Sequence, residues 1–219
     1  MVDAGVGSRQ YFEEIYASRT WEYYRPIVAH VVANSAPGPI LDIGAGTGLF
    51  VEAATRWGLD CQGIEGSEEA VAIGRKRHDG LRLSQHYLSA PLPFAGEQFQ
   101  TVLLHQVIAH LEPDVARHVL AEASRVMRRG GLLLIFSPGR FNKTVQRDNP
   151  SCVAWVQMYA PSEMRALVTS AGFRNVVPLD APRELLGKNP LGRLAMRATL
   201  RLTRWDRLSA TANCQASRP

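Results

Sequence analysis

Cysteine is scarce in this chain, and long apolar runs are missing. Only three cysteines occur among 219 residues, Cys61, Cys152 and Cys214. Their odd number and scattered spacing exclude a disulfide framework and a cysteine-based metal site. No uninterrupted apolar run approaches the roughly 18 residues that a membrane-spanning helix needs. The first residues also lack the basic and apolar regions of a secretory signal peptide. These absences predict a cytoplasmic protein with reduced thiols.

An excess of charge of one sign is also missing from most of the chain. Residues 1–180 contain 17 basic and 18 acidic side chains, whereas residues 181–219 contain 8 and 2. The formal net charge of +5 therefore comes from the C-terminal part. With 46% hydrophobic and 21% charged residues, the composition is that of a globular protein. The length predicts one domain over residues 1–219.

Short apolar runs alternate with amphipathic segments along the chain, which predicts an α/β protein with a doubly wound sheet. A helical leader is expected over 10–33, with Pro26 at the start of a second helix. Strands are expected at 39–43, 61–65, 81–87, 99–105, 131–137, 176–179 and 210–217, and the remaining helices at 48–57, 67–78, 112–128 and 161–171.

The most informative stretch is a glycine-rich loop that follows an apolar run. Ile40–Ile43 is typical of a buried strand, Gly44–Gly48 of a loop at a helix start, and Glu65 closes the next apolar run. Glycines let a backbone approach a ligand closely, and free amides at a helix start suit an anionic group. An acid about 20 residues further on is placed to accept hydrogen bonds from ribose hydroxyls. The unit predicts a site for an adenosine-bearing cofactor at the carboxyl ends of a parallel sheet.

The spacing of the glycines indicates which cofactor. The loop has the pattern G-x-G-x-G, and Leu49 stands where a dinucleotide fingerprint has its third glycine. Asp42 occupies a position two residues before the first glycine, where dinucleotide-binding proteins normally carry an apolar residue. This arrangement resembles motif I of class I S-adenosylmethionine-dependent methyltransferases. A doubly wound sheet that binds another nucleotide is the alternative.

The resemblance continues in register over roughly residues 38–179. It implies S-adenosyl-L-methionine as the cofactor and a Rossmann-like, doubly wound, seven-stranded, mostly parallel sheet with an antiparallel last strand. It also implies a helical leader (1–36), a cofactor-binding core (37–180), a basic helical insertion (181–208) and a final strand (209–219). The further matching segments are Gln62–Glu65, Pro91–Phe94 with Phe99–Val102, Val126–Leu132 and Ser170–Phe173.

The resemblance implies roles at the methionine and sugar ends of the cofactor. The three glycines would line the methionine end. Asp42 would orient it by accepting a hydrogen bond from a loop amide, a water or the cofactor's amino group. Glu65 would accept the ribose hydroxyls, and His105 and Gln106 would face the sulfonium. The predicted cofactor-binding residues are Asp42, Gly44, Ala45, Gly46, Gly48, Glu65, Gly66, Leu88, Ser89, His105 and Gln106.

The chain departs from the family where the adenine amino group is normally bound. The family usually has an Asp near Leu88 or Ser89, and neither residue is acidic. Backbone groups or the Ser89 hydroxyl would have to substitute. We expect weaker cofactor affinity, not a different cofactor.

The segment His105–Leu111 is similar to a segment of the ubiquinone-pathway O-methyltransferase branch. In that branch two Glu and a His bind a divalent metal, whereas this chain has Gln106, Ala109 and His110. Both carboxylates are absent, so we predict no metal site. His105 and His110 are the candidate catalytic bases, because histidine suits proton removal near neutral pH. The alternative for His110 is that it braces the adjacent loop.

The methyl acceptor is bounded by what the chain lacks. Methyltransferases that act on amino groups of nucleobases commonly carry an Asp/Asn-Pro-Pro-aromatic tetrad after the fourth strand, and here that position reads Leu104–Val107. The tail has no interleaved aromatics for stacking, so we predict no nucleic-acid partner. We expect methyl transfer to an oxygen of a small-molecule or lipid-linked metabolite. The alternative is a catalytically inactive, cofactor-binding regulatory or partner protein.

The candidate substrate contacts are Tyr11, Tyr16, Tyr24 and Arg140, and for the tyrosines of the leader the alternative is packing on the core.

The basic tail has a helical period with an arginine ridge on one face. Apolar residues recur over 190–208, while the arginines share another face. A basic amphipathic helix can contact an anionic membrane surface from the cytoplasmic side or cover an acidic substrate. A lid helix with a solvated arginine face is the alternative. The ridge consists of Arg193, Arg197, Arg201 and Arg204.

Overall fold

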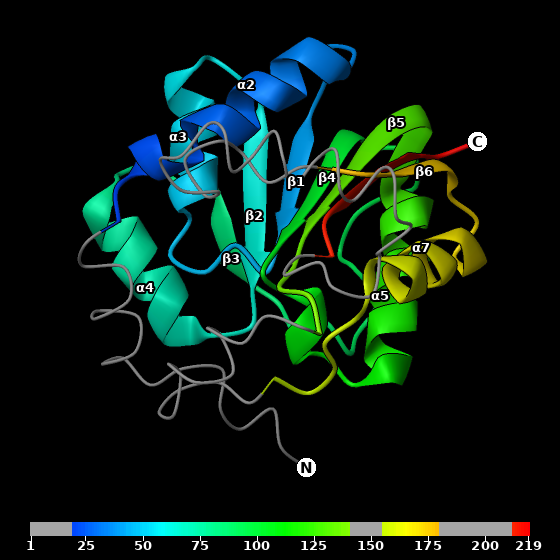
Figure 1. Cartoon of the computed structure of the whole chain (residues 1–219). Coiled ribbons are helices and arrows are strands. Elements are labelled where there is room, and N and C mark those ends of the chain that lie inside the picture. The colour runs from blue at the N-terminus through cyan, green and yellow to red at the C-terminus, as the bar shows by residue number, and fades with distance from the viewer. Residues whose placement is uncertain (1–18, 141–154, 180–211) are drawn as a thin grey trace, which may run out of the picture.

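The computed structural model describes residues 19–140, 155–179 and 212–219. They form a seven-stranded sheet with strand order β3-β2-β1-β4-β5-β7-β6 (Figure 1). Strands β1 to β5 pair in parallel, and β7 is antiparallel to both β5 and β6. This confirms the predicted Rossmann-like α/β sheet with an antiparallel last strand. The strands are β1 Ile40–Ile43, β2 Cys61–Glu65, β3 Leu83–Gln85, β4 Phe99–His105, β5 Met127–Phe136, β6 Arg174–Pro178 and β7 Cys214–Ser217.

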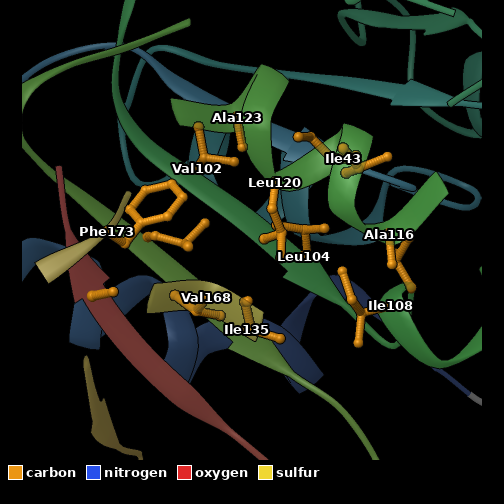
Figure 2. Close-up of a cluster of buried hydrophobic side chains, with 14 of the residues drawn as sticks. Ile43, Val102, Leu104, Ile108, Ala116, Leu120, Ala123, Ile135, Val168 and Phe173 are labelled. Atoms are coloured by element: carbon orange, nitrogen blue, oxygen red, sulfur yellow. The ribbon is translucent and has the colours of Figure 1, made fainter. Parts of the chain in front are cut away.

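Helices cover both faces of the sheet (Figure 1). One apolar cluster joins the sheet to α5 and α7, and a second joins it to η1, α2 and α3. On α5, buried residues recur at helical spacing, at positions 116, 119, 120, 123 and 126, which produces one continuous apolar stripe. Figure 2 shows this stripe against Ile43, Leu104 and Ile135 of the sheet. The helices are η1 Trp21–Tyr24, α2 Arg25–Asn34, α3 Leu49–Arg56, α4 Glu68–Arg77, η2 Ile108–His110, α5 Pro113–Val126 and α7 Pro161–Ser170.

The strands that flank the glycine loop are buried along their whole length. All four residues of β1 and all seven of β4 are buried. Strands of a parallel sheet covered on both faces have this continuous apolar character. The carboxyl ends of β1, β2 and β4 are neighbours in the sheet. The residues that follow these three strands therefore meet at one edge.

Element bounds differ from the sequence expectation around α5 and β5. The helix expected to Arg128 ends at Val126, because Met127 adopts an extended backbone (φ −79°, ψ 149°) and begins β5. Met127 pairs with Phe99, and the register of the β4–β5 ladder shifts before Thr101. Gly130 has φ +72° in this irregular stretch. The apolar pattern alone did not distinguish this bulged strand start from a last helical turn.

The leader and the C-terminal part are described only partly. Pro26 lies in the first turn of α2, as predicted, and η1 precedes it. The expected strand at 210–217 is present as β7. Residues 1–18 of the leader and the basic segment 181–208 lie outside the described residues, so the predicted insertion is not tested. Within the described ranges, no helix is long and apolar enough to cross a bilayer.

Candidate active site

The loop between β1 and α3 has a backbone that requires glycine. Gly44, Gly46 and Gly48 have φ values of +71°, +55° and +75°, in the left-handed region that side chains disfavour. A Cβ on Gly44 would lie only 2.4 Å from Cγ2 of Val107. Val107 follows β4, so the loop packs closely on the segment after that strand. The loop is thus a bare main-chain bend at the carboxyl edge of the sheet.

Glu65 holds this loop from the end of β2. Its Oε2 accepts a hydrogen bond from the Gly46 amide at 2.8 Å, and its Oε1 accepts one from the Ser67 amide at 3.0 Å. Glu65 is 5% exposed. Burial raises the pKa of Glu65, and hydrogen bonds from the amides of Ser67, Gly46 and Gly66 oppose that rise. Each carboxylate oxygen has a further lone pair, so the group can also accept hydroxyl donors.

Helix α4 holds the opposite side of the loop. Nη2 of Arg77 donates to the Thr47 carbonyl at 2.7 Å, and Nη1 donates to the Thr47 hydroxyl at 3.3 Å. A Cβ on Gly74 would lie 2.5 Å from the same carbonyl oxygen, so the helix can approach only because this residue is glycine. The loop is therefore held between Glu65 and α4.

Asp42 places an unsatisfied acceptor beside the loop. The residue is 3% exposed, and its Oδ1 has no hydrogen-bond partner. The amides of Gly44 and Ala45 both donate to the Ile64 carbonyl, and Gly46 donates to Glu65. Burial raises the pKa of Asp42 well above its usual range, and the nearby Glu65 adds to that rise. With these loop amides engaged elsewhere, a water or a ligand donor is left to satisfy Oδ1.

His105 is buried among aromatic rings at the end of β4. Its Nδ1 lies 3.4 Å from the Tyr24 hydroxyl. The imidazole centroid is 5.1 Å from the ring of Tyr24, 5.7 Å from that of Phe136 and 6.3 Å from that of Tyr23. Desolvation lowers the pKa of His105 to about 3, and the charge of Arg19 acts in the same direction. The ring is neutral at physiological pH, and its Nε2 is buried without a partner.

Gln106 turns the chain immediately after His105. Its φ is +63°, a conformation that few non-glycine residues adopt and that often occurs at functional sites. Its amide donates to the Phe136 carbonyl at 2.7 Å, while the residue itself is exposed. This turn places the Gln106 side chain at the solvent side of the edge where β1, β2 and β4 end.

His110 stacks on Trp155, a residue that the sequence reasoning did not single out. The two ring centroids are 4.1 Å apart with an interplanar angle of 21°. The amides of Val156 and Gln157 both donate to the Ala109 carbonyl, so this segment is tied to η2. The Trp155 indole Nε1 is buried without a partner. The arrangement agrees with the bracing alternative for His110. No local signal in the sequence links these residues.

Known proteins are similar to this chain in the segment that forms this edge of the sheet. A family model described as a methyltransferase domain matches residues 41–135, the segment that contains the loop, Glu65 and His105. A probable S-adenosylmethionine-dependent methyltransferase of Mycobacterium tuberculosis is 31% identical over 137 residues, which cover 63% of this chain and 49% of that protein. The chain contains a class I S-adenosylmethionine-dependent methyltransferase domain. Its cofactor is S-adenosyl-L-methionine.

Two further relatives carry more specific names. A ubiquinone biosynthesis O-methyltransferase of a Ruegeria species is 28% identical over 151 residues, covering 63% of this chain and 60% of that protein. The structure of phosphoethanolamine N-methyltransferase 2 from Haemonchus contortus, solved with S-adenosyl-L-methionine, matches with a TM-score of 0.66 and 16% identity, covering 97% of this chain and 57% of that one. This structural likeness concerns the fold. The chain spans 49% of the Mycobacterium relative and 60% of the Ruegeria relative.

Three features of the methyltransferase domain fit its cofactor. The orphaned Oδ1 of Asp42 is an acceptor for a donor on the cofactor. The Gly44–Gly48 bend offers main chain where any Cβ at Gly44 would collide with Val107. Glu65 lies against the same bend. Asp42, the bend and Glu65 lie together at this edge of the sheet, and their contacts with the methionine and ribose ends of the cofactor stay predictions.

The remaining predicted site residues of the domain lie in varied surroundings. Leu88 packs partly buried against the core, and Ser89 is exposed. Arg140 forms an ion pair with Glu163 at 2.8 Å, and its amide donates to the Tyr159 carbonyl.

Tyr24 is 5% exposed, so it contacts His105 from within the core. Tyr11, Tyr16 and the arginine ridge lie outside the described residues. In the described ranges, no group of three His, Cys, Asp or Glu side chains is placed to hold a metal ion.

Proposed function

We propose that this protein transfers the methyl group of S-adenosylmethionine to an oxygen atom of a small-molecule or lipid-linked metabolite without using a metal ion. The observation that carries the proposal is the neutral His105 at the end of β4, with Nε2 buried and unpartnered. The similarity to ubiquinone biosynthesis O-methyltransferases supports an oxygen acceptor. The relatives found by sequence are named as methyltransferases, and the comparisons lend no support to an inactive, cofactor-binding partner protein.

Different residues of the site would hold the cofactor and orient the methyl acceptor. Asp42, Glu65 and the glycine loop would hold S-adenosylmethionine, which when bound supplies an activated methyl group. Positioning of two reactants can lower a barrier by ~7–11 kcal/mol. Transfer to a hydroxyl forms a carbon–oxygen bond and releases the hydroxyl proton.

His105 suits the task of orienting the acceptor hydroxyl. In the tautomer whose Nδ1–H donates to the Tyr24 hydroxyl, Nε2 can accept a hydrogen bond from the acceptor. A pKa of about 3 makes the ring a weak proton acceptor, because efficient bases have pKa values near the working pH. We therefore assign His105 an orienting role, with the proton passing to solvent or to the substrate's own groups. His110, stacked on Trp155, would brace η2.

Titration calorimetry and an acceptor panel test this proposal. S-adenosylmethionine should bind with saturation, and Gly46→Arg or Glu65→Ala should abolish the signal. The panel should contain matched phenols, alcohols and amines, with S-adenosylhomocysteine formation measured by mass spectrometry in the presence and absence of EDTA. Turnover confined to hydroxyl acceptors and insensitive to EDTA supports the proposal. Turnover with amines alone, or activity lost with EDTA and restored by Mg²⁺, contradicts it.

The arginine ridge is proposed to contact an anionic membrane surface that presents a lipid-linked acceptor. The support is the sequence pattern alone, since these residues lie outside the described ranges. Salt-sensitive sedimentation with vesicles containing phosphatidylglycerol is expected, and a variant with Ala at 193, 197, 201 and 204 should remain in the supernatant. Equal sedimentation of the two proteins would remove the membrane role and leave the methyltransferase proposal intact.

A further inference from the structure

An aromatic ring stands exposed beside the residue that follows Glu65. Tyr87 is 48% exposed, although a ring of this size is usually buried more fully. A Cβ on Gly66 would lie 3.8 Å from Cδ1 of Tyr87, so the ring flanks Gly66 at ordinary van der Waals distance. The ring therefore lies next to the site that we assign to the ribose of the cofactor.

Hydrogen bonds fix the position of this ring. Nε2 of Gln85 donates to the Tyr87 hydroxyl at 3.2 Å and to the Gly66 carbonyl at 3.3 Å. The amide of His86 donates to the Glu65 carbonyl at 2.9 Å, which ties the end of β3 to the end of β2. The Ala90 amide donates to the Tyr87 carbonyl and closes a turn. Both the backbone and the hydroxyl end of Tyr87 are thus held in place.

The neighbouring residues leave the base of the cofactor without other obvious support. Gly66 has no side chain to cover a base bound beside Glu65. Positions 86–90, which follow β3, contain no carboxylate that could accept a hydrogen bond from the adenine amino group. The base is linked directly to the ribose, so it must lie within a few ångströms of the residues around Glu65. The exposed Tyr87 ring is a surface of the right chemistry at that place.

We propose that Tyr87 stacks on the adenine base of S-adenosylmethionine and supplies much of the binding energy for that base. The assignment rests on cofactor binding by the methyltransferase domain. Stacking requires only two flat aromatic faces and does not depend on hydrogen bonds to the base. Tyr87 thus substitutes for the carboxylate that is absent at Leu88 and Ser89. Gly66 presents no side chain toward the ring, and the hydrogen bond from Gln85 holds its hydroxyl end.

Calorimetric titration with S-adenosylhomocysteine tests the stacking role. Tyr87→Ala should bind about tenfold more weakly, within the range found when a base-stacking aromatic is truncated. Tyr87→Phe keeps the ring and should bind within about threefold of the wild type. Trp57→Ala is the matched control, because Trp57 is an exposed aromatic (42%) at the end of α3, and its affinity should not change. Thermal melts without ligand check that all three variants are folded.

A second ligand separates base stacking from effects on the methionine end. 5′-Methylthioadenosine keeps the adenine and ribose but lacks the amino-acid arm, and Tyr87→Ala should lose affinity for it by the same factor. Equal binding of S-adenosylhomocysteine by Tyr87→Ala and wild type would overturn the inference, as would a loss in Tyr87→Phe as large as in Tyr87→Ala. A wild-type protein that fails to bind S-adenosylhomocysteine would instead overturn the function proposed above.

Discussion

The amide of Gly46 donates to the carboxylate of Glu65 across 19 positions of sequence, at 2.8 Å. This hydrogen bond joins the loop after β1 to the end of β2 and gives the loop its shape. The residue that we propose for ribose binding is therefore also a structural support for the bend that we propose for the methionine end. Changes at either residue should affect both ends of the cofactor at once.

Glu65→Gln is the first test of this coupling. The amide side chain keeps one acceptor oxygen, but it presents an NH₂ group to one of the two backbone donors. We expect affinity for S-adenosylhomocysteine to fall at least tenfold, with a loss of stability of about 1–3 kcal/mol from the unsatisfied amide. Calorimetry and urea denaturation measure the two effects. Glu68→Gln, at an exposed position of α4, is the control and should leave both values unchanged.

Gly44→Ala tests the packing of the bend. The substitution should cost about 1–2 kcal/mol for the left-handed backbone and about 1–3 kcal/mol more for overpacking against Val107. Gly58→Ala isolates the first contribution, because Gly58 has a similar φ of +75° and nothing lies within 4 Å of its Cβ position. Denaturant titrations of both variants measure the difference. Equal losses would mean that Val107 moves aside freely.

Asp42→Asn should stabilise the ligand-free protein at neutral pH. The folded carboxyl keeps its proton well above pH 3.8, the ordinary value. Between the two pKa values the folded state holds more protons than the unfolded state, so stability falls as pH rises through the folded pKa. Asn avoids that loss. The melting temperature of the Asp42→Asn variant should exceed that of the wild type by about 2–4 °C for each kcal/mol of stability that is recovered.

The pH dependence of this difference is the decisive measurement for Asp42. The gap between the Asp42→Asn variant and the wild type should shrink as pH falls toward 4, where both side chains are neutral. Affinity for S-adenosylhomocysteine should fall in the variant, since an acceptor oxygen has been replaced. If the variant were less stable than the wild type at pH 7.5, the buried carboxyl of Asp42 would not be a source of instability.

His105→Gln should make the protein less sensitive to acid. In the folded protein the pKa of His105 is about 3, against an ordinary value of 6.5. Between pH 6.5 and pH 3 the imidazole is therefore protonated in the unfolded state but not in the folded state. Stability is then lost as pH falls from 6.5 toward 3, by at most ~1.4 kcal/mol per pH unit. The difference in stability between wild type and variant should therefore change steadily over this window. A constant difference would contradict the buried, neutral imidazole.

The placement of the glycine loop and Glu65 at one edge of the sheet could be predicted, because the information for it is local. The pattern Gly44 to Gly48 and the acid at Glu65 lie within one strand–loop–helix–strand unit, so their spacing alone determines which end of the sheet they share. The seven-stranded, mostly parallel sheet with an antiparallel last strand followed from the resemblance and was confirmed. The end of α5 was wrong by two residues, because Met127 and Arg128 begin a bulged strand that keeps a helix-like apolar period.

The surroundings of the predicted catalytic residues could not be predicted from sequence. The contact of His105 with Tyr24 joins positions 81 apart, and the stack of His110 on Trp155 joins a loop to a segment that returns after β5. Neither pair leaves a spacing pattern, because tertiary packing alone brings them together. The role that we propose for Tyr87 could not be predicted either, because an aromatic residue next to a strand end is common and its contact with Gly66 comes from the tertiary structure.

The position of β7 has a consequence for how the nascent chain folds. Residues 214–217 insert between β5 and β6, and in the described ranges β6 is joined to the other strands only through them. A ribosome-bound chain halted before residue 212 would expose the unpaired edges of β5 and β6, which are adhesive to other polypeptides. Pairing of residues 214–217 with both strands therefore closes an aggregation-prone gap.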